Sequence, residues 1–396
     1  MTTYTTDIAI LGGGIAGLFL FHGLSRRGYH CTLLDPSPLG NGQTVHSQGI
    51  IHGGMKYALN GVLNAEAEAI RGMPARWKTL VQGTDDFDLS KITVLSEHQW
   101  MWSSKGLGTK LATFFASKAL RGAIYPIKPP SYPDFFQTPE FSGKVYEMAD
   151  WVLDVPSLVN TLNEPFAGNS YQMHNGDSGQ INKTDDGQIA SITLQSNDGQ
   201  AFDLKAQHYF FTSGQGNEQW LDQLQWPSVA AQRRPLHMVM LKAKQLPPLF
   251  AHGIGMSNKP TATITTHPHP DGSSVWYIGG NVAEQGLDRS EGQQIDAAQS
   301  QLHDLFPWFQ VEQPTWGTLR IDRAEPKQSA LTKPDAAVTH TQGNATIAWP
   351  TKLALAPNAY DQIMESGCLE AIQPTHDHAP LPLNPNTVAR PTWEQL

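Results

Sequence analysis

The stretch 7–35 reads DIAILGGGIAGLFLFHGLSRRGYHCTLLD, and it carries the clearest pattern of secondary structure in the chain. Asp7 to Leu11 form a short apolar run, three glycines follow, and apolar residues at helical spacing continue to Arg26. A further apolar run from His30 to Leu34 is typical of a strand. The sequence therefore predicts a strand, a glycine turn, a helix and a second strand, which is one βαβ unit at the start of the chain.

The turn carries the spacing GxGxxG at Gly12, Gly14 and Gly17, with Ile15 and Ala16 between the last two. In dinucleotide-binding folds these glycines permit a tight turn, close approach of a pyrophosphate and packing of helix on strand. Asp35 follows 23 residues after Gly12, where an acid accepts hydrogen bonds from a ribose. A glycine turn without a ligand is the competing interpretation. Because Asp35 would repel a 2′-phosphate, NADP is disfavoured, and NAD and FAD both stay open.

Length and composition limit the class of protein, its partners and its cellular compartment. With 396 residues the chain is long enough for two domains around a buried site. Its net charge is −9, without basic blocks, which argues against nucleic acid as a partner. Its two cysteines cannot form a disulfide framework, so we expect a reducing, cytoplasmic setting. The apolar start lacks a basic leader and is interrupted by glycines, which is unlike a signal peptide or a membrane span.

Four further segments follow the βαβ unit in a recognisable order. They are SQGIIHGGMKY at 47–57, DVPSL at 154–158, a glycine-rich turn after Phe211, and IAWPTKLALAPNA at 347–359. With the first motif, this order resembles the D-amino-acid oxidase superfamily of FAD-dependent oxidoreductases, over roughly 7–365. The HGGMKY segment is most similar to the glycerol-3-phosphate dehydrogenase and L-2-hydroxyglutarate dehydrogenase branches.

The resemblance implies an α/β fold in which a discontinuous, Rossmann-like FAD-binding domain carries an inserted α+β substrate domain with a mostly antiparallel sheet. The expected FAD-binding domain comprises 1–71, 145–232 and 316–370. The expected substrate domain comprises 72–144 and 233–315, and 371–396 is expected to be an extended tail. The stretch 106–121 predicts an amphipathic helix, which we interpret as packed within a domain rather than lying on a membrane surface.

We expect FAD to be bound noncovalently, although some members of the superfamily attach it covalently, and the resemblance implies where it would lie. The segment 47–54 would run beside the pyrophosphate and the isoalloxazine ring, and 352–356 would lie by the pyrimidine end of the ring at a helix N-terminus. Besides the first motif and Asp35, the implied cofactor contacts are Pro36, Ser47, Gln48, Gly49, Ile51, Gly53, Ser213, Gly214, Thr351, Lys352, Leu353 and Ala354. The chain departs from the family pattern in having Asp35 where Glu is common and Trp349-Pro350 where glycines are common.

Candidate residues for the chemistry are cations and histidines. In the superfamily, flavin N5 accepts a hydride from a carbon bearing N or O, while the protein binds and orients the substrate. Lys56, Arg320 and Arg323 are candidate clamps for an anionic substrate, although each could instead form an ordinary ion pair. Lys56 stands where the glycerol-3-phosphate branch tends to carry Arg. His52 is our candidate to orient the flavin or move a proton.

Three other groups of histidines have weaker signals. His46 fits a structural role better, and His237, which we place at the start of a strand, is a lesser acid/base candidate. The pairs His267/His269 and His376/His378 lack a third ligand at metal-binding spacing, so we expect no metal.

The expected function is oxidation of a small polar, anionic metabolite by FAD, with oxygen, a quinone or a carrier as electron acceptor and at most peripheral membrane contact. Two alternatives stay open: an NAD-dependent dehydrogenase built on the same βαβ unit, and a flavin-binding protein with a structural or RNA-modifying role. The acidic balance counts against RNA.

Overall fold

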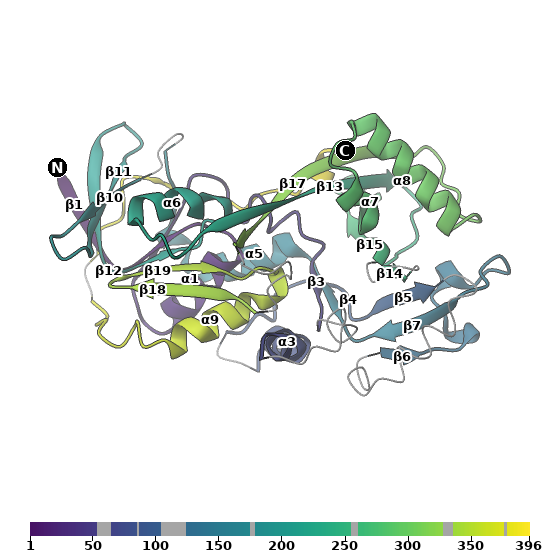
Figure 1. Ribbon diagram of the computed structural model, residues 1–396, viewed down its shortest axis with the longest axis horizontal. Coiled ribbons are helices and arrows are strands. Elements are labelled where there is room, and N and C mark those ends of the chain that lie inside the picture. The colour runs from purple at the N-terminus through teal and green to yellow at the C-terminus, as the bar shows by residue number, and fades with distance from the viewer. Residues whose placement is uncertain are drawn as a thin grey trace.

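The computed structural model describes residues 1–53, 65–84, 87–103, 124–174, 179–254, 260–327, 336–375 and 378–396. They form two lobes, each built on a large sheet, and the long strands β13 and β17 reach from one lobe toward the other (Figure 1). Within these residues no helix is both long and apolar enough to cross a bilayer. The α/β class and the mostly antiparallel second sheet are confirmed.

The first lobe contains a sheet whose centre is parallel. Strand β1 pairs in parallel with β2 on one side and with β12 on the other, and β12 pairs in parallel with β19. Antiparallel strands extend both edges. The strands are β1 (Thr2–Leu11), β2 (Cys31–Asp35), β9 (Ser170–Gln172), β10 (Gln180–Lys183), β11 (Ile189–Gln195), β12 (Ala201–Phe211), β18 (Val338–Gln342), β19 (Ala345–Trp349) and β20 (Asn384–Pro385).

Four helices pack together on this sheet because their apolar residues share one core with alternate residues of the strands. Ile8, Ile10 and Leu33 point into this core, whereas Ala9, Leu11 and Leu34 point into a second core on the other face. The helices are α1 (Ile15–Arg26), α3 (Ala65–Val81), α5 (Val155–Asn163) and α9 (Ala356–Glu365). Helix α6 (Asn217–Leu224) contributes Trp220 and Leu221 to the second core.

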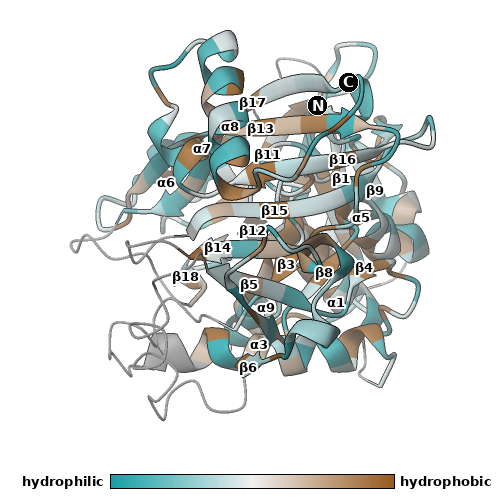
Figure 2. Ribbon diagram, turned by 90° about the vertical axis from the view of Figure 1, so that its right-hand side faces the viewer, coloured by the Kyte–Doolittle hydropathy of each residue, from teal (hydrophilic) through white to brown (hydrophobic). Residues whose placement is uncertain are grey.

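The second lobe contains a mostly antiparallel sheet with apolar residues buried on both faces. Helices α7 (Asn281–Gln285) and α8 (Glu291–Leu305) lie beside β13 and β17 (Figure 2). One sheet face packs Val239, Leu241 and Trp276 against α8. The strands, in spatial order, are β17 (Thr315–Pro326), β13 (Ala231–Ala243), β16 (Ser274–Gly279), β15 (Pro260–Pro268), β14 (Ala251–Ile254), β5 (Gln99–Ser103), β7 (Lys144–Met148) and β6 (Ile124–Pro126).

A third, small sheet lies between these elements. Strand β8 (Trp151–Leu153) pairs with β3 (Ile50–Ile51) and with β4 (Val94–Ser96). The DVPSL segment directly after β8 begins α5: the Asp154 carboxylate accepts a hydrogen bond from the Ser157 N–H at 2.9 Å, as an N-cap residue does. This capping fixes the exit of β8 and thereby the position of β3.

The division into domains stays a prediction, but three elements pack differently from the expected boundaries. Helix α3 continues across the boundary at 71/72, and Trp77 and Leu80 pack in the core of the first lobe. Strand β17, assigned to the FAD-binding domain from 316 onward, pairs with β13 in the second sheet. The expected tail 371–396 is packed: it includes β20, and the Trp393 side chain is only 2% exposed. The predicted helix 106–121 lies outside the described residues.

Candidate functional site

The ends of the parallel strands converge at one edge of the first sheet. Leu11 aligns with Leu34 of β2 and with Phe211 of β12, and Phe211 aligns with Ile347 of β19. Gly12, Asp35 and Ser213 therefore leave the sheet side by side. In open α/β sheets, ligands bind outside the carboxyl ends of the strands, so this edge is the place for a dinucleotide.

The glycines of the turn are required by close packing. Gly12 has a φ of +115°, and a Cβ there would lie 2.5 Å from the Ser213 backbone. A Cβ on Gly17 would lie 1.9 Å from the Gly12 carbonyl oxygen. The N-terminal turn of α1 contains no acidic side chain. Its positive dipole end is thus left available to an anion such as a pyrophosphate.

Asp35 sits against the glycine turn at the end of β2. Its carboxylate accepts hydrogen bonds from the Gly13 N–H at 2.6 Å and from the Ser37 N–H at 2.7 Å. Burial raises the pKa of Asp35 to about 6, although these two hydrogen bonds act in the opposite direction. Pro36 follows directly, and its carbonyl accepts a hydrogen bond from the Gln172 amide at 3.3 Å.

Sequence reasoning missed Thr44. Its hydroxyl accepts a hydrogen bond from the Ile15 N–H at 3.0 Å and so caps the first turn of α1 from a loop 29 residues away. In the sequence, Thr44 is recognisable only as a polar residue in the loop between β2 and the HGG segment. This signal is too weak to identify Thr44 as a site residue without the observed contact. The buried hydroxyl oxygen of Ser47, in the same loop, has no hydrogen-bond partner.

Gln48 ties this loop to the other lobe. Its side-chain amide donates to the carbonyls of Thr263 at 3.1 Å and Tyr277 at 3.0 Å. In return, the buried Tyr277 hydroxyl donates to the carbonyl of His46 at 3.0 Å. The Gln48 side chain is therefore committed to holding the second sheet, a role that the sequence did not reveal.

The HGG segment and the C-terminal segment meet beside β3. The short helix η6 (Leu353–Leu355) contacts both β3 and α3, and the Trp77 indole N–H donates to the Ala354 carbonyl at 2.8 Å. At Gly49, where φ is +69°, the backbone carbonyl accepts a hydrogen bond from the Leu153 N–H at 2.9 Å. Two segments some three hundred residues apart are thereby placed at the same edge as the glycine turn.

The segment after β19 forms a turn without the glycines that are common in the family at this place. Thr351 adopts a left-handed φ of +58°, which is rare for a threonine, and its hydroxyl donates to the Ala336 carbonyl at 3.3 Å. The Lys352 N–H donates to the Pro350 carbonyl at 2.6 Å, and η6 leads into α9. The indole nitrogen of Trp349 is buried without a hydrogen-bond partner.

The second glycine-rich turn closes this edge from β12. The Ser213 hydroxyl donates to the Leu11 carbonyl at 2.8 Å and accepts from the Trp220 indole at 3.1 Å. Gly214 follows with a φ of +58°. Ser213 therefore fixes the turn through its side chain, and its backbone stands directly against Gly12.

The two candidate arginines lie on opposite faces of β17. Arg320 donates from its guanidinium to the carbonyls of Leu287 and Arg289 and is exposed. By strand alternation Arg323 lies on the opposite face of β17, with Leu319 and Ile321, which pack with Tyr277 on the side that meets the His46 loop. Arg323 is half-buried. Lys56 lies outside the described residues.

The candidate histidines lie in different surroundings. His52 is half-buried directly after β3. His46 is held at both ring nitrogens, by the Gly42 carbonyl at 2.6 Å and the Thr392 hydroxyl at 2.9 Å. His237 lies inside β13 rather than at its start; it is fully buried, with Nδ1 2.9 Å from the Gly286 carbonyl. His46 and His52 both belong to the chain segment between Thr44, which contacts the first turn of α1, and the end of β3, whereas His237 belongs to the second sheet.

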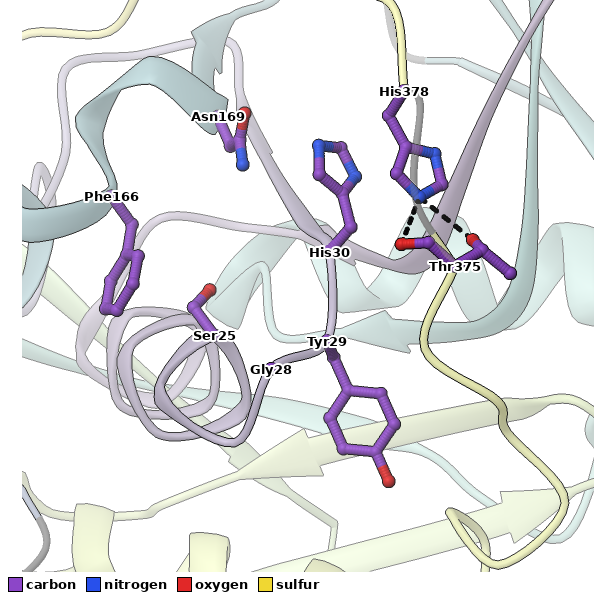
Figure 3. Close-up of a pocket in the computed structure, with 8 residues that line it drawn as sticks. All are labelled: Ser25, Gly28, Tyr29, His30, Phe166, Asn169, Thr375 and His378. Carbon is purple, nitrogen blue, oxygen red and sulfur yellow. Dashed lines mark hydrogen bonds between the residues drawn. The ribbon is translucent and has the colours of Figure 1, made fainter.

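A pocket of about 310 Å³ lies elsewhere on the first lobe (Figure 3). It opens where β2 begins, beside Thr5 and Thr6 of β1, and the stacked rings of His30 and His378, 3.9 Å apart, form one wall. This edge is opposite to the one that carries Gly12 and Asp35. The pocket is therefore separate from the candidate site.

The residues at the glycine-turn edge fit a flavin dinucleotide. They offer the N-terminus of α1 for the pyrophosphate and the Asp35 carboxylate for a ribose. They also offer the buried Ser47 hydroxyl, which has no hydrogen-bond partner in the protein. When bound there, the cofactor would be held by the Gly12–Gly17 turn, Asp35 and the Ser47 segment, with the 352–355 segment beside β3.

Known proteins are similar to this chain in sequence and in structure. Residues 7–334 match the family model described as FAD dependent oxidoreductase. A probable FAD-dependent oxidoreductase of Pseudomonas aeruginosa is 44% identical over 393 residues, covering 98% of each chain. A crystal structure of the FAD-dependent oxidoreductase from that organism superposes with a TM-score of 0.83 at 38% identity, over 100% of this chain and 99% of the other.

More distant structures share the fold alone. Glycine oxidase from Geobacillus kaustophilus has a TM-score of 0.64 at 12% identity, covering 98% of this chain and 99% of the other. L-alpha-glycerophosphate oxidase from Mycoplasma pneumoniae, crystallised with FAD bound, has a TM-score of 0.63 at 13% identity, covering 97% and 98%. The sequence-based assignment is confirmed: this chain belongs to the FAD-dependent oxidoreductases of the D-amino-acid oxidase family, and its cofactor is FAD.

Proposed function

We propose that the protein removes a hydride from a carbon bearing a hydroxyl or amino group in a small, polar, anionic metabolite: a 2-hydroxy acid, an amino acid or amine, or a polyol phosphate. The observation that carries the proposal is the juxtaposition of three segments, namely the Gly12 turn, the 47–53 segment and the second sheet held over it by Gln48. Bound FAD supplies the hydride acceptor.

The chain's own residues orient the substrate. Arg323 lies on the sheet face toward the His46 loop and presents a planar fork of donors, which suits bidentate binding of a carboxylate or phosphate. His52 adjoins the same edge and is the candidate to move a proton near neutral pH. The distant relatives include a glycine oxidase and a glycerophosphate oxidase, which is consistent with either nitrogen or oxygen on the reacting carbon.

The experiment is anaerobic bleaching of the flavin absorbance by a panel of 2-hydroxy acids, amino acids, amines and glycerol phosphates. One class should bleach the flavin at submillimolar concentration, and readmission of air then separates an oxidase from a dehydrogenase. If the protein binds FAD but no anionic metabolite reduces it, the proposed substrate class is wrong.

A matched pair of variants tests the anion clamp. Arg323→Met should raise KM for the bleaching substrate about 10-fold or more, since a charged hydrogen bond contributes about 1.5–3 kcal/mol. Arg320→Met, on the other face of the same strand, should leave KM unchanged and lower only the stability. Equal KM values for the two variants would remove Arg323 from the site.

A further inference from the structure

Asp150 lies directly behind the HGG segment. It precedes β8, and the pairing of Trp151 with Ile51 places it beside His52 and Gly53. Its side chain is only 7% exposed. No sequence motif pointed to this residue, because its neighbours are about a hundred positions away along the chain.

The two oxygens of this carboxyl group have different surroundings. Oδ1 accepts a hydrogen bond from the Gly53 N–H at 3.3 Å, whereas Oδ2 is buried without a hydrogen-bond partner. A buried carboxylate needs compensation for the water it loses, and a single long hydrogen bond supplies little. The neutral carboxylic acid is therefore the form that this environment tolerates.

Among the described residues, several ionisable groups lie on the elements around Asp150. They are His52 after β3, Arg71 in α3, and the pair of Glu147 in β7 and His98 before β5, whose side chains lie 2.9 Å apart. Burial has the largest effect and raises the pKa of Asp150 to about 7, and the Gly53 hydrogen bond opposes it. Asp150 consequently titrates near neutral pH.

We propose that Asp150 is a positioning residue, acting as a neutral acid, that sets the backbone of His52 and Gly53 for the flavin. The proposal rests on the proposed placement of FAD along 47–53. Ionisation would leave a buried, unpaired negative charge behind this segment, near a cofactor that itself carries negative phosphates. FAD binding and the neutral form of Asp150 should therefore favour each other.

The test measures release of FAD from the holoenzyme, followed by flavin fluorescence on dilution, between pH 6.5 and 8.5. In the unmodified protein the dissociation constant should rise at least fivefold over this range, because Asp150 ionises. Asp150→Asn preserves the shape and the Gly53 hydrogen bond without a charge, so its dissociation constant should stay flat and match the unmodified value at pH 6.5. Asp150→Ala, which lacks the acceptor, should bind FAD about 10-fold more weakly at every pH.

The outcomes separate positioning from a merely structural role. A rise above pH 7 that persists in Asp150→Asn would overturn the proposal, as would Asp150→Ala with unchanged affinity. If Asp150→Ala does not fold, the comparison of Asp150→Asn with the unmodified protein is sufficient. The unmodified protein should show the infrared carbonyl band of a protonated carboxyl at pH 6.5, and this band must be absent in Asp150→Asn. Substrate is not involved, so failure here is distinct from failure of the bleaching experiment.

Discussion

At the scale of single residues, the glycine turn is the part of the site that tolerates least change. Gly17→Ala would place a Cβ 1.9 Å from the Gly12 oxygen and 2.7 Å from the Thr212 hydroxyl, so α1 must move away from the pyrophosphate position. We expect loss of bound flavin, measured as the ratio of absorbance at the flavin band to that at the protein band. Gly72→Ala is the control, because no atom lies within 4 Å of its added Cβ in α3. It should retain flavin and gain about 0.5–1 kcal/mol of stability. Flavin retained by Gly17→Ala would contradict the packing argument.

Asp35 should give FAD affinity a dependence on pH opposite to that of Asp150. The pKa of Asp35 is raised by burial to about 6, and ribose hydroxyls donating to its carboxylate would favour the charged form. Binding then requires loss of a proton below pH 6, so affinity should fall as pH decreases from 6 to 5. Asp35→Asn should bind FAD more weakly at pH 7 and lose this acid dependence. Titrations of both proteins at pH 5, 6 and 7 check the sign, and an acid dependence retained by Asp35→Asn would exclude Asp35 as its source.

Residues whose roles depend on local spacing could be predicted, and those defined by distant contacts could not. The positions of Gly12, Gly17 and Asp35 follow from one βαβ unit, and the structure brings all three to one edge. Thr44 and Asp150 act through hydrogen bonds to Ile15 and Gly53, and no periodicity in the chain records such pairs.

At the scale of elements, the DVPSL segment has a physical meaning that the family resemblance left unstated. Asp154 caps α5, which packs against α1 and follows the strand that holds β3. Asp154→Ala should cost about 1 kcal/mol of unfolding free energy, whereas Asp154→Asn, which keeps an acceptor, should cost only a few tenths. Chemical denaturation of the holoenzyme measures both. Equal losses for the two variants would show that the charge, rather than the cap, matters.

Elements with one dominant periodicity were predictable, and long strands shared between lobes were not. The helix predicted after the glycine turn, with apolar residues continuing to Arg26, is α1. Arg320 and Arg323 are equivalent candidate clamps in the sequence, and only their place in β17, which pairs with β13, shows that the two side chains lie on opposite faces. Strand partners that are distant in sequence are set by tertiary packing, to which local patterns are blind.

At the scale of the whole molecule, the C-terminal residues connect the two lobes at the candidate site. Thr392 bonds to His46, and the Trp393 ring lies 4.4 Å from His267 and 5.0 Å from Tyr277, measured between ring centroids. Tyr277 in turn bonds to the His46 carbonyl. The loop that leads to the flavin segment is thus fixed by the second sheet on one side and by the C-terminal residues on the other.

Trp393→Ala tests this connection between the lobes. Removing a buried Trp side chain costs about 3–5 kcal/mol, and here the loss should fall on the contact between lobes rather than on either core. Amide hydrogen exchange should therefore become about 10-fold faster or more in 46–49 and 275–279, with little change in β1. Trp226→Ala is the control, because Trp226 packs only in the second core of the first lobe. It should lower stability without selectively exposing 46–49. If the two variants give the same exchange pattern, the C-terminal residues only add stability, and the hydrogen bonds of Gln48 and Tyr277 must hold the second sheet over the flavin segment.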